Sequence, residues 1–180
     1  MGYRLRGVLT FLSVVALGAA VAQAEDSKWV SVMPPGKGFS VEMPLKPTLT
    51  VTQSPSFLGT VENLDYRAVQ GKDAYIVNRV DLPGIATFFL SNASLLDRVR
   101  DEYIKQGAAT EKSYGTAERD GHEGKTLWFV RGDADGEPED GYAEFFIVDG
   151  TLFTFTGLLE RGKDPANAKR YLSSIKFLKD

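Results

Sequence analysis

The chain has 180 residues, of which 21 are basic and 24 acidic, and it contains no cysteine and a single histidine. Without cysteine there can be no disulfide, no thiol nucleophile and no cysteine-based metal site. One histidine excludes a metal site built from several histidines of one chain. Since no basic stretch stands out, we expect no nucleic-acid partner.

The first 24 residues are predicted to be a signal peptide. Arg4 and Arg6 form a basic start, residues 7–20 are apolar, and Ala22 and Ala24 are the small residues that precede a cleavage site. The apolar stretch is shorter than the roughly 20 residues of a membrane-spanning helix. We therefore expect cleavage after Ala24, a periplasmic or secreted location, and no stable membrane span in the mature chain.

Residues 25–180 have the length of one domain. Loss of Arg4 and Arg6 with the leader leaves 19 basic against 24 acidic residues, a net charge of −5. No internal repeat or long linker divides this stretch. We expect a single domain that is stabilised by hydrophobic burial.

Strand patterns dominate the first half of the domain. Residues 48–52 alternate, and the pattern predicts that Leu49 and Val51 point inward, whereas residues 54–59 are expected to form a loop. Four further strands are expected, at 29–33, 38–43, 60–70 and 74–82.

Two helices are predicted. Residues 93–106 form an amphipathic pattern with charged residues on one side. Asp164 is the expected N-cap of a second helix over 165–174, because Pro165 suits the first helical position. The apolar side of the first helix comprises Leu95, Leu96, Val99 and Tyr103.

The centre of the sheet is expected at residues 141–159, where Asp149-Gly150 is a strong hairpin signal. The strand before this turn has an apolar run over 145–148, which indicates that both its faces are covered. The strand around 127–130 has the same character and is expected beside the hairpin. The sequence therefore predicts an α+β fold, an α/β/α sandwich with a central, mainly antiparallel sheet of about six to eight strands and two main helices.

Three short segments resemble the PsbP-like family. They are GFSVEMP at 38–44, RDGHEGKTLWF at 119–129 and AKRYLSSIKFL at 168–178. The family includes an extrinsic photosystem II protein, and many of its bacterial members are exported. The resemblance covers nearly the whole of 25–180 and implies an α/β/α sandwich there, and it carries over no metal-binding or partner-binding residue.

An acidic segment is the first candidate site. Five carboxylates stand within eight residues, and oxygen ligands at alternating positions suit Ca²⁺. Glu144 stands at position twelve of this segment, although Pro138 occupies the place where an EF-hand loop needs glycine. The alternative is a solvated acidic loop. The candidate metal ligands are Asp133, Asp135, Glu137, Glu139 and Asp140.

Apolar residues in connecting segments form a second candidate site, a surface for a partner or ligand. The alternative is that they pack over the sheet as additional core. His122 could act as an acid or base, but its flanking glycines are more typical of a tight turn, and no nucleophile motif accompanies it. The surface residues are Phe57, Leu58, Ile85, Phe88 and Phe89.

These patterns favour a non-catalytic, exported module that binds a protein partner in the cell envelope. The alternative is a periplasmic protein that binds a small ligand or Ca²⁺, and an enzyme ranks third. No other cofactor is expected.

Overall fold

The structure is a computed structural model that describes residues 29–56, 59–82, 91–132 and 135–178. Strands dominate it, and every pairing between the described strands is antiparallel. The strands are β1 (Val30–Val32), β2 (Phe39–Met43), β3 (Thr48–Ser56), β4 (Gly59–Gln70), β5 (Asp73–Asp81), β6 (Thr110–Arg119), β7 (His122–Gly132), β8 (Pro138–Val148), β9 (Thr151–Glu160) and β10 (Lys176–Phe177). The helices are α2 (Asn92–Gln106) and α3 (Ala166–Ser173).

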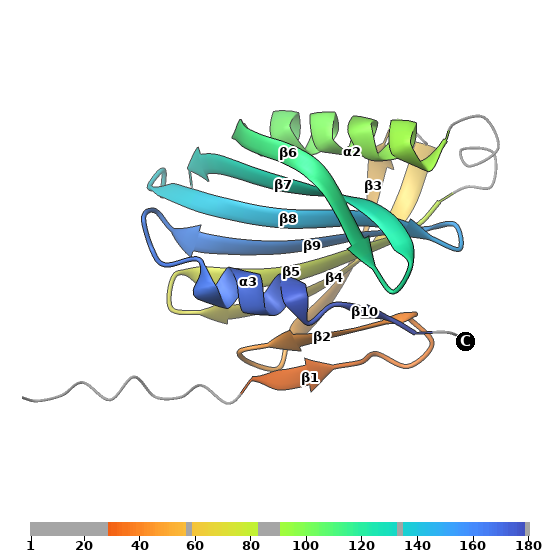
Figure 1. Cartoon of the computed structure of the whole chain (residues 1–180), viewed down its shortest axis with the longest axis horizontal. Coiled ribbons are helices and arrows are strands. Elements are labelled where there is room, and N and C mark those ends of the chain that lie inside the picture. The colour runs from red at the N-terminus through yellow and green to blue at the C-terminus, as the bar shows by residue number, and fades with distance from the viewer. Residues whose placement is uncertain (1–28, 57–58, 83–90, 133–134, 179–180) are drawn as a thin grey trace, which may run out of the picture.

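Seven strands form the main sheet in the order β3-β4-β5-β9-β8-β7-β6, and β1, β2 and β10 form a small sheet (Figure 1). Helix α2 packs on one face of the main sheet, against β7 and β8. Helix α3 and the small sheet cover the other face. We call these the α2 face and the α3 face. The predicted α+β sandwich is confirmed, and the small sheet that joins both ends of the domain is an addition to it.

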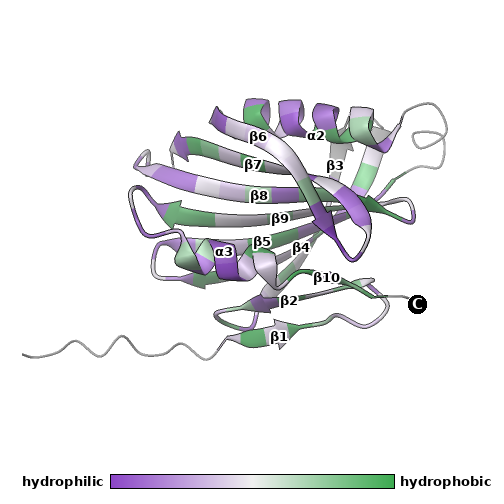
Figure 2. Cartoon of the chain, in the orientation of Figure 1, coloured by the Kyte–Doolittle hydropathy of each residue, from purple (hydrophilic) through white to green (hydrophobic). Residues whose placement is uncertain are grey.

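The predicted central hairpin is confirmed, because β9 is the fourth of seven strands and β8 lies beside it. Asp149 and Gly150 both have positive φ, 48° and 76°, as a tight two-residue hairpin turn requires. Strand β7 pairs with β8, as the apolar run at 127–130 indicated. Figure 2 shows hydrophobic residues at intervals along these strands, whereas much of α2 is hydrophilic.

Each face of the main sheet has its own apolar core. On the α3 face, the fully buried Phe39 of β2 lies edge-on to three rings of the main sheet, with centroids 5.6 to 5.9 Å away. On the α2 face, Leu95 and Leu96 are buried against the sheet, as the amphipathic pattern predicted. The three rings that contact Phe39 belong to Tyr66, Phe153 and Phe155.

Both helices begin close to their predicted positions. Ser91 caps α2, since its hydroxyl accepts a hydrogen bond from the Ser94 amide at 3.2 Å. The N-cap of α3 is Pro165, so the prediction of Asp164 as the N-cap and Pro165 as the first helical residue is wrong by one position. Asp164 Oδ1 still accepts a hydrogen bond from the Ala166 amide at 3.0 Å. Neither helix in the described part of the chain is long and apolar enough to cross a membrane.

Two predictions for the segment around β3 are wrong. Leu49 and Val51 are 48% and 53% exposed, because β3 is the outermost strand and the small sheet covers only its inner neighbours. The expected loop at 54–59 is largely strand, since β3 continues to Ser56 and β4 begins at Gly59.

Candidate functional site

The acidic segment does not form a single loop. Asp133 lies outside the described residues, and Asp135 and Glu137 are exposed. Glu139 and Asp140 instead belong to β8 and are 7% and 8% exposed. The prediction of a solvated loop is therefore wrong for these last two residues.

The buried carboxylates of this segment have protein partners. Glu139 Oε1 accepts a hydrogen bond from Arg131 Nε at 2.6 Å, and Asp140 Oδ2 accepts one from the Gly162 amide at 3.0 Å. Both contacts fasten the start of β8 to neighbouring segments. In the described ranges, no three His, Cys, Asp or Glu residues gather as a metal site would require. Calcium binding by the acidic segment thus stays a prediction from sequence.

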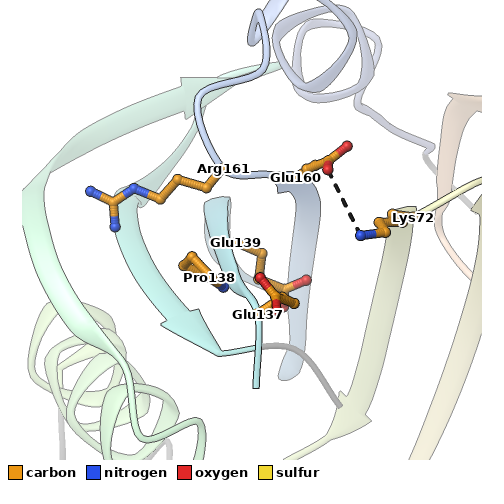
Figure 3. Close-up of a pocket in the computed structure, with 6 residues that line it drawn as sticks. All are labelled: Lys72, Glu137, Pro138, Glu139, Glu160 and Arg161. Atoms are coloured by element: carbon orange, nitrogen blue, oxygen red, sulfur yellow. Dashed lines mark ion pairs between the residues drawn. The ribbon is translucent and has the colours of Figure 1, made fainter. Parts of the chain in front are cut away.

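A polar pocket of about 210 Å³ lies at this end of the sheet (Figure 3). Lys72 Nζ and Glu160 Oε1 are 3.8 Å apart across it, and both side chains are more than half exposed. Arg161 extends to the opposite side of the pocket. Exposed ion pairs of this kind contribute little energy, and we assign the pocket no function. Its lining comprises Lys72, Glu137, Pro138, Glu139, Glu160 and Arg161.

A larger hollow of about 620 Å³ lies between the start of α2 and the β6–β7 hairpin. His122 is among its lining residues, and its ring lies edge-on to Phe177 with centroids 5.3 Å apart. Asp120 Oδ2 accepts a hydrogen bond from the Phe177 amide at 2.8 Å. The turn around His122 therefore joins the hairpin to β10, which is a structural role.

The predicted apolar surface cannot be placed. Phe57, Leu58, Ile85, Phe88 and Phe89 all lie outside the described residues. Their role as a partner surface remains a prediction from sequence.

The most unusual polar group on the α3 face is Glu144, in the middle of β8. It is 6% exposed, and its Oε1 is 2.7 Å from Arg119 Nη2. Its second oxygen, Oε2, is buried without a hydrogen-bond partner in the structure, as is Arg119 Nε. Burial raises the pKa of Glu144 to about 7, although the Arg119 guanidinium acts to lower it. Such a perturbed carboxyl group marks a candidate functional site.

Small residues of β6 and β7 surround Arg119. Ala117 and Gly124 are register partners on the α3 face, and Gly115 is the next β6 residue on that face. A Cβ at Gly124 would collide with the Phe146 ring. The absence of long side chains at these positions lets Arg119 reach from the edge strand β6 to Glu144 on β8.

An aromatic pair of the exposed Trp128 and the half-buried Tyr142 lies beside Glu144. Trp128 of β7 and Tyr142 of β8 are register partners, and their rings are parallel within 1° with centroids 6.3 Å apart. Trp128 is 40% exposed. Tyr142 is two residues from Glu144 on the same strand, and therefore on the same face, about 7 Å away. We name the set Arg119, Trp128, Tyr142 and Glu144 the Trp128 surface.

Asp65 is a half-buried carboxylate that also has a raised pKa, which desolvation causes and Arg67 partly offsets. Its Oδ1 also has no partner in the structure. It lies on the other face, opposite Asn78 in the β4–β5 register. Asp65 has no stacked aromatic pair among its register partners Thr50 and Asn78, so the Trp128 surface is the stronger candidate.

Sequence reasoning missed the Trp128 surface. The sequence pattern presents Glu144 only as a possible last ligand of the acidic segment, and Trp128 only as part of an apolar strand. The sequence does contain one signal. Glu144 directly precedes the apolar run at 145–148, and a charged residue is unusual in a strand that is covered on both faces.

The sheet order and the two covered faces define the fold class, a PsbP-like α+β sandwich. The solution structure of cyanobacterial PsbP (CyanoP) from Synechocystis sp. PCC 6803 is similar over 90% of this chain and 99% of its own, with a TM-score of 0.56 and 15% identity. At this identity the likeness shows the fold alone.

A protein of unknown function, PA94 from Pseudomonas aeruginosa, matches with a TM-score of 0.43 and 13% identity, over 78% of this chain and 86% of its own. No protein-family model matches the sequence, and no curated protein does.

Proposed function

We propose that this protein is a non-catalytic accessory module that binds a partner protein through the Trp128 surface. The proposal includes export, with cleavage after Ala24, so that the partner is a component of the cell envelope.

The exposed Trp128 is the observation that carries the proposal. A tryptophan that is 40% exposed keeps much of a large apolar ring in water, and its stacking on Tyr142 fixes the ring in one orientation. A partner that covers this ring gains burial without a large loss of side-chain entropy. Tryptophan, tyrosine and arginine are also the residues most enriched at the energetic centres of protein interfaces.

Glu144 and Arg119 indicate the chemistry of the partner segment. Glu144 Oε2 is an unused acceptor, and Arg119 Nε is an unused donor. Both atoms are buried in the free protein, so a partner pairs with them only if docking displaces the partly exposed Arg119 side chain. A peptide group can then satisfy both, because its amide donates and its carbonyl accepts. The surface therefore suits a partner segment that places an apolar side chain or a flat peptide unit on Trp128.

The arrangement favours recognition over catalysis. One oxygen of Glu144 is already held by Arg119 at 2.7 Å, which positions the carboxylate as a fixed polar contact. The resemblance to a family that includes an extrinsic photosystem II protein gives a precedent for an accessory docking role. That precedent is an analogy of fold, and the side chains of the surface carry the argument.

The test compares wild-type protein with Trp128→Ser and with a matched control, Val69→Ser. Val69 is 49% exposed on β4, far from the Trp128 surface in the strand order. Each tagged protein is used for quantitative co-purification from envelope extracts, and the captured partner is then titrated against the purified variants. We expect Trp128→Ser to weaken binding at least about tenfold, since interface tryptophans often contribute 2 kcal/mol or more.

The control variant should bind like the wild type, and both variants should keep melting temperatures close to it. Equal binding by all three proteins would show that Trp128 is not part of the interface. A large loss of stability in Trp128→Ser would instead assign the ring to the core and remove the basis of the proposal.

A further inference from the structure

The two outer strands of the main sheet differ in how they are protected. An outer strand exposes unpaired backbone groups, and proteins block pairing there with charged residues or β-bulges. The β6 strand has both devices. Its register with β7 shifts between Glu111 and Ser113, and four of its ten residues are charged.

The other outer strand, β3, has neither device. Its sequence TLTVTQSPS contains no charged residue, and its nine-residue register with β4 has no shift. Its one proline, Pro55, lies near the end of the strand and outside residues 48–52. All side chains from Thr48 to Gln53 are exposed, including the apolar Leu49 and Val51. Within the described residues β3 is paired with β4 only. In the part of the chain that the structure describes, its outer edge is therefore unpaired and can accept another strand.

The sequence of this edge is self-complementary. Residues 48–52 read Thr-Leu-Thr-Val-Thr, which is nearly the same pattern in both directions. In an antiparallel pair of two copies centred on Thr50, Thr50 faces its own counterpart and each Leu49 faces Val51 of the other copy. The outer positions pair Thr48 with Thr52. Aliphatic and threonine pairs of this kind stabilise antiparallel strands.

We propose that β3 pairs with β3 of a second copy of this chain, antiparallel about a two-fold axis at Thr50, to form a continuous sheet through both molecules. This inference is independent of the proposed function, because the Trp128 surface lies toward the opposite end of the strand order. A two-fold interface uses each contact twice, so a self-complementary strand fits a second copy better than an unrelated peptide.

The expected dimer is reversible. A single pair of short strands buries less area than the roughly 1,000 Å² that characterises stable interfaces. The test must therefore capture a weak association at a defined register.

Because the chain contains no cysteine, a single engineered cysteine can form a disulfide only with its counterpart in a second copy. In Thr50→Cys the two cysteines face each other, and opposite Cα atoms of antiparallel strands lie about 4.5–5.5 Å apart, within disulfide range. In the control Thr52→Cys, the two cysteines are displaced by four residues along the strands, about 14 Å, and cannot join. Both side chains are exposed, so neither change should disturb the fold.

We expect mild oxidation of the purified protein to convert most Thr50→Cys chains to a disulfide-linked dimer, at least tenfold faster than Thr52→Cys. Sedimentation equilibrium should show self-association of the wild type that weakens in Thr50→Lys, where two like charges meet at the axis. Equal rates of cross-linking in both cysteine variants would overturn the proposal. The proposal would also be overturned if the wild type stayed monomeric at the highest concentration measured and Thr50→Cys formed no disulfide-linked dimer under mild oxidation.

Discussion

Glu144 combines two environments within one side chain. One oxygen is held by Arg119, and the other is buried without a partner. The folded protein raises the pKa of this carboxyl group from 4.5 to about 7, mainly through burial. It therefore binds a proton at Glu144 more tightly than the unfolded chain does.

This difference sets the direction of a pH effect on stability. The stabilising contribution of the protonated Glu144 is full below about pH 4.5 and is lost as the pH rises through about 7. The variant Glu144→Gln stays neutral and avoids this loss. Between pH 5 and pH 8, we expect its free energy of unfolding to improve relative to wild type by on the order of 1–2 kcal/mol, after allowance for solvent screening.

Urea unfolding at both pH values measures the effect. The control is Glu42→Gln, which removes an exposed ion pair with Arg170 and should show no comparable change with pH. A difference between Glu144→Gln and wild type that is constant from pH 5 to pH 8 would contradict the account of Glu144.

Glu144 also shows why the sequence could not predict the site. Its partner Arg119 is 25 residues away, on a strand that is not its direct neighbour. Linear spacing placed Glu144 with the acidic segment, whereas the strand register places it beside Trp128 and Tyr142. Side-chain alternation can predict that residues share a face, but not which strands lie next to one another.

At the scale of elements, the packing of β8 against β7 requires a glycine where an aromatic ring lies directly on the backbone. Gly141 of β8 is the register partner of Phe129 of β7, and a Cβ at Gly141 would collide with the fully buried Phe129 ring. Gly115 of β6 is a matched comparison, because a Cβ there would meet only Thr126 Cγ2 at 3.4 Å, an ordinary contact.

We expect Gly141→Ala to lower the free energy of unfolding by about 2–3 kcal/mol, since the ring has no free space into which it can move. Gly115→Ala should change it by less than about 1 kcal/mol. Urea unfolding of both variants provides the measurement. Equal effects in the two variants would mean that Phe129 relaxes freely, and that the core on the α2 face is looser than the structure indicates.

Strand β3 shows which property of an element its sequence pattern does not predict. The alternation of Leu49 and Val51 with threonines correctly indicated a strand with one apolar face. It could not indicate whether that face is covered, because coverage depends on the place of the strand in the sheet. The strand is outermost, so the same alternation leaves an apolar edge that suits a second copy.

For the whole molecule, the fold class was predictable because its signals are local. The Asp149-Gly150 turn, the apolar runs and the amphipathic pattern of the first helix each act within a few residues or turns. The small sheet was not predictable in the same way, since β2 pairs with β10 across more than 130 residues. The candidate site also depends on residues that distant strand pairings bring together. For this reason the sequence predicts the fold better than it predicts the function.

The central claim is that a partner protein docks on the Trp128 surface, and site-specific photo-crosslinking in living cells tests it most directly. A photoreactive amino acid replaces Ser113, which is exposed and is the register partner of Trp128 on β6, and in a parallel strain it replaces Val69. We predict one discrete adduct from position 113, its loss when Trp128→Ser is added, and no such adduct from position 69. The same adducts from both positions, or an adduct at 113 that persists in Trp128→Ser, would contradict the claim.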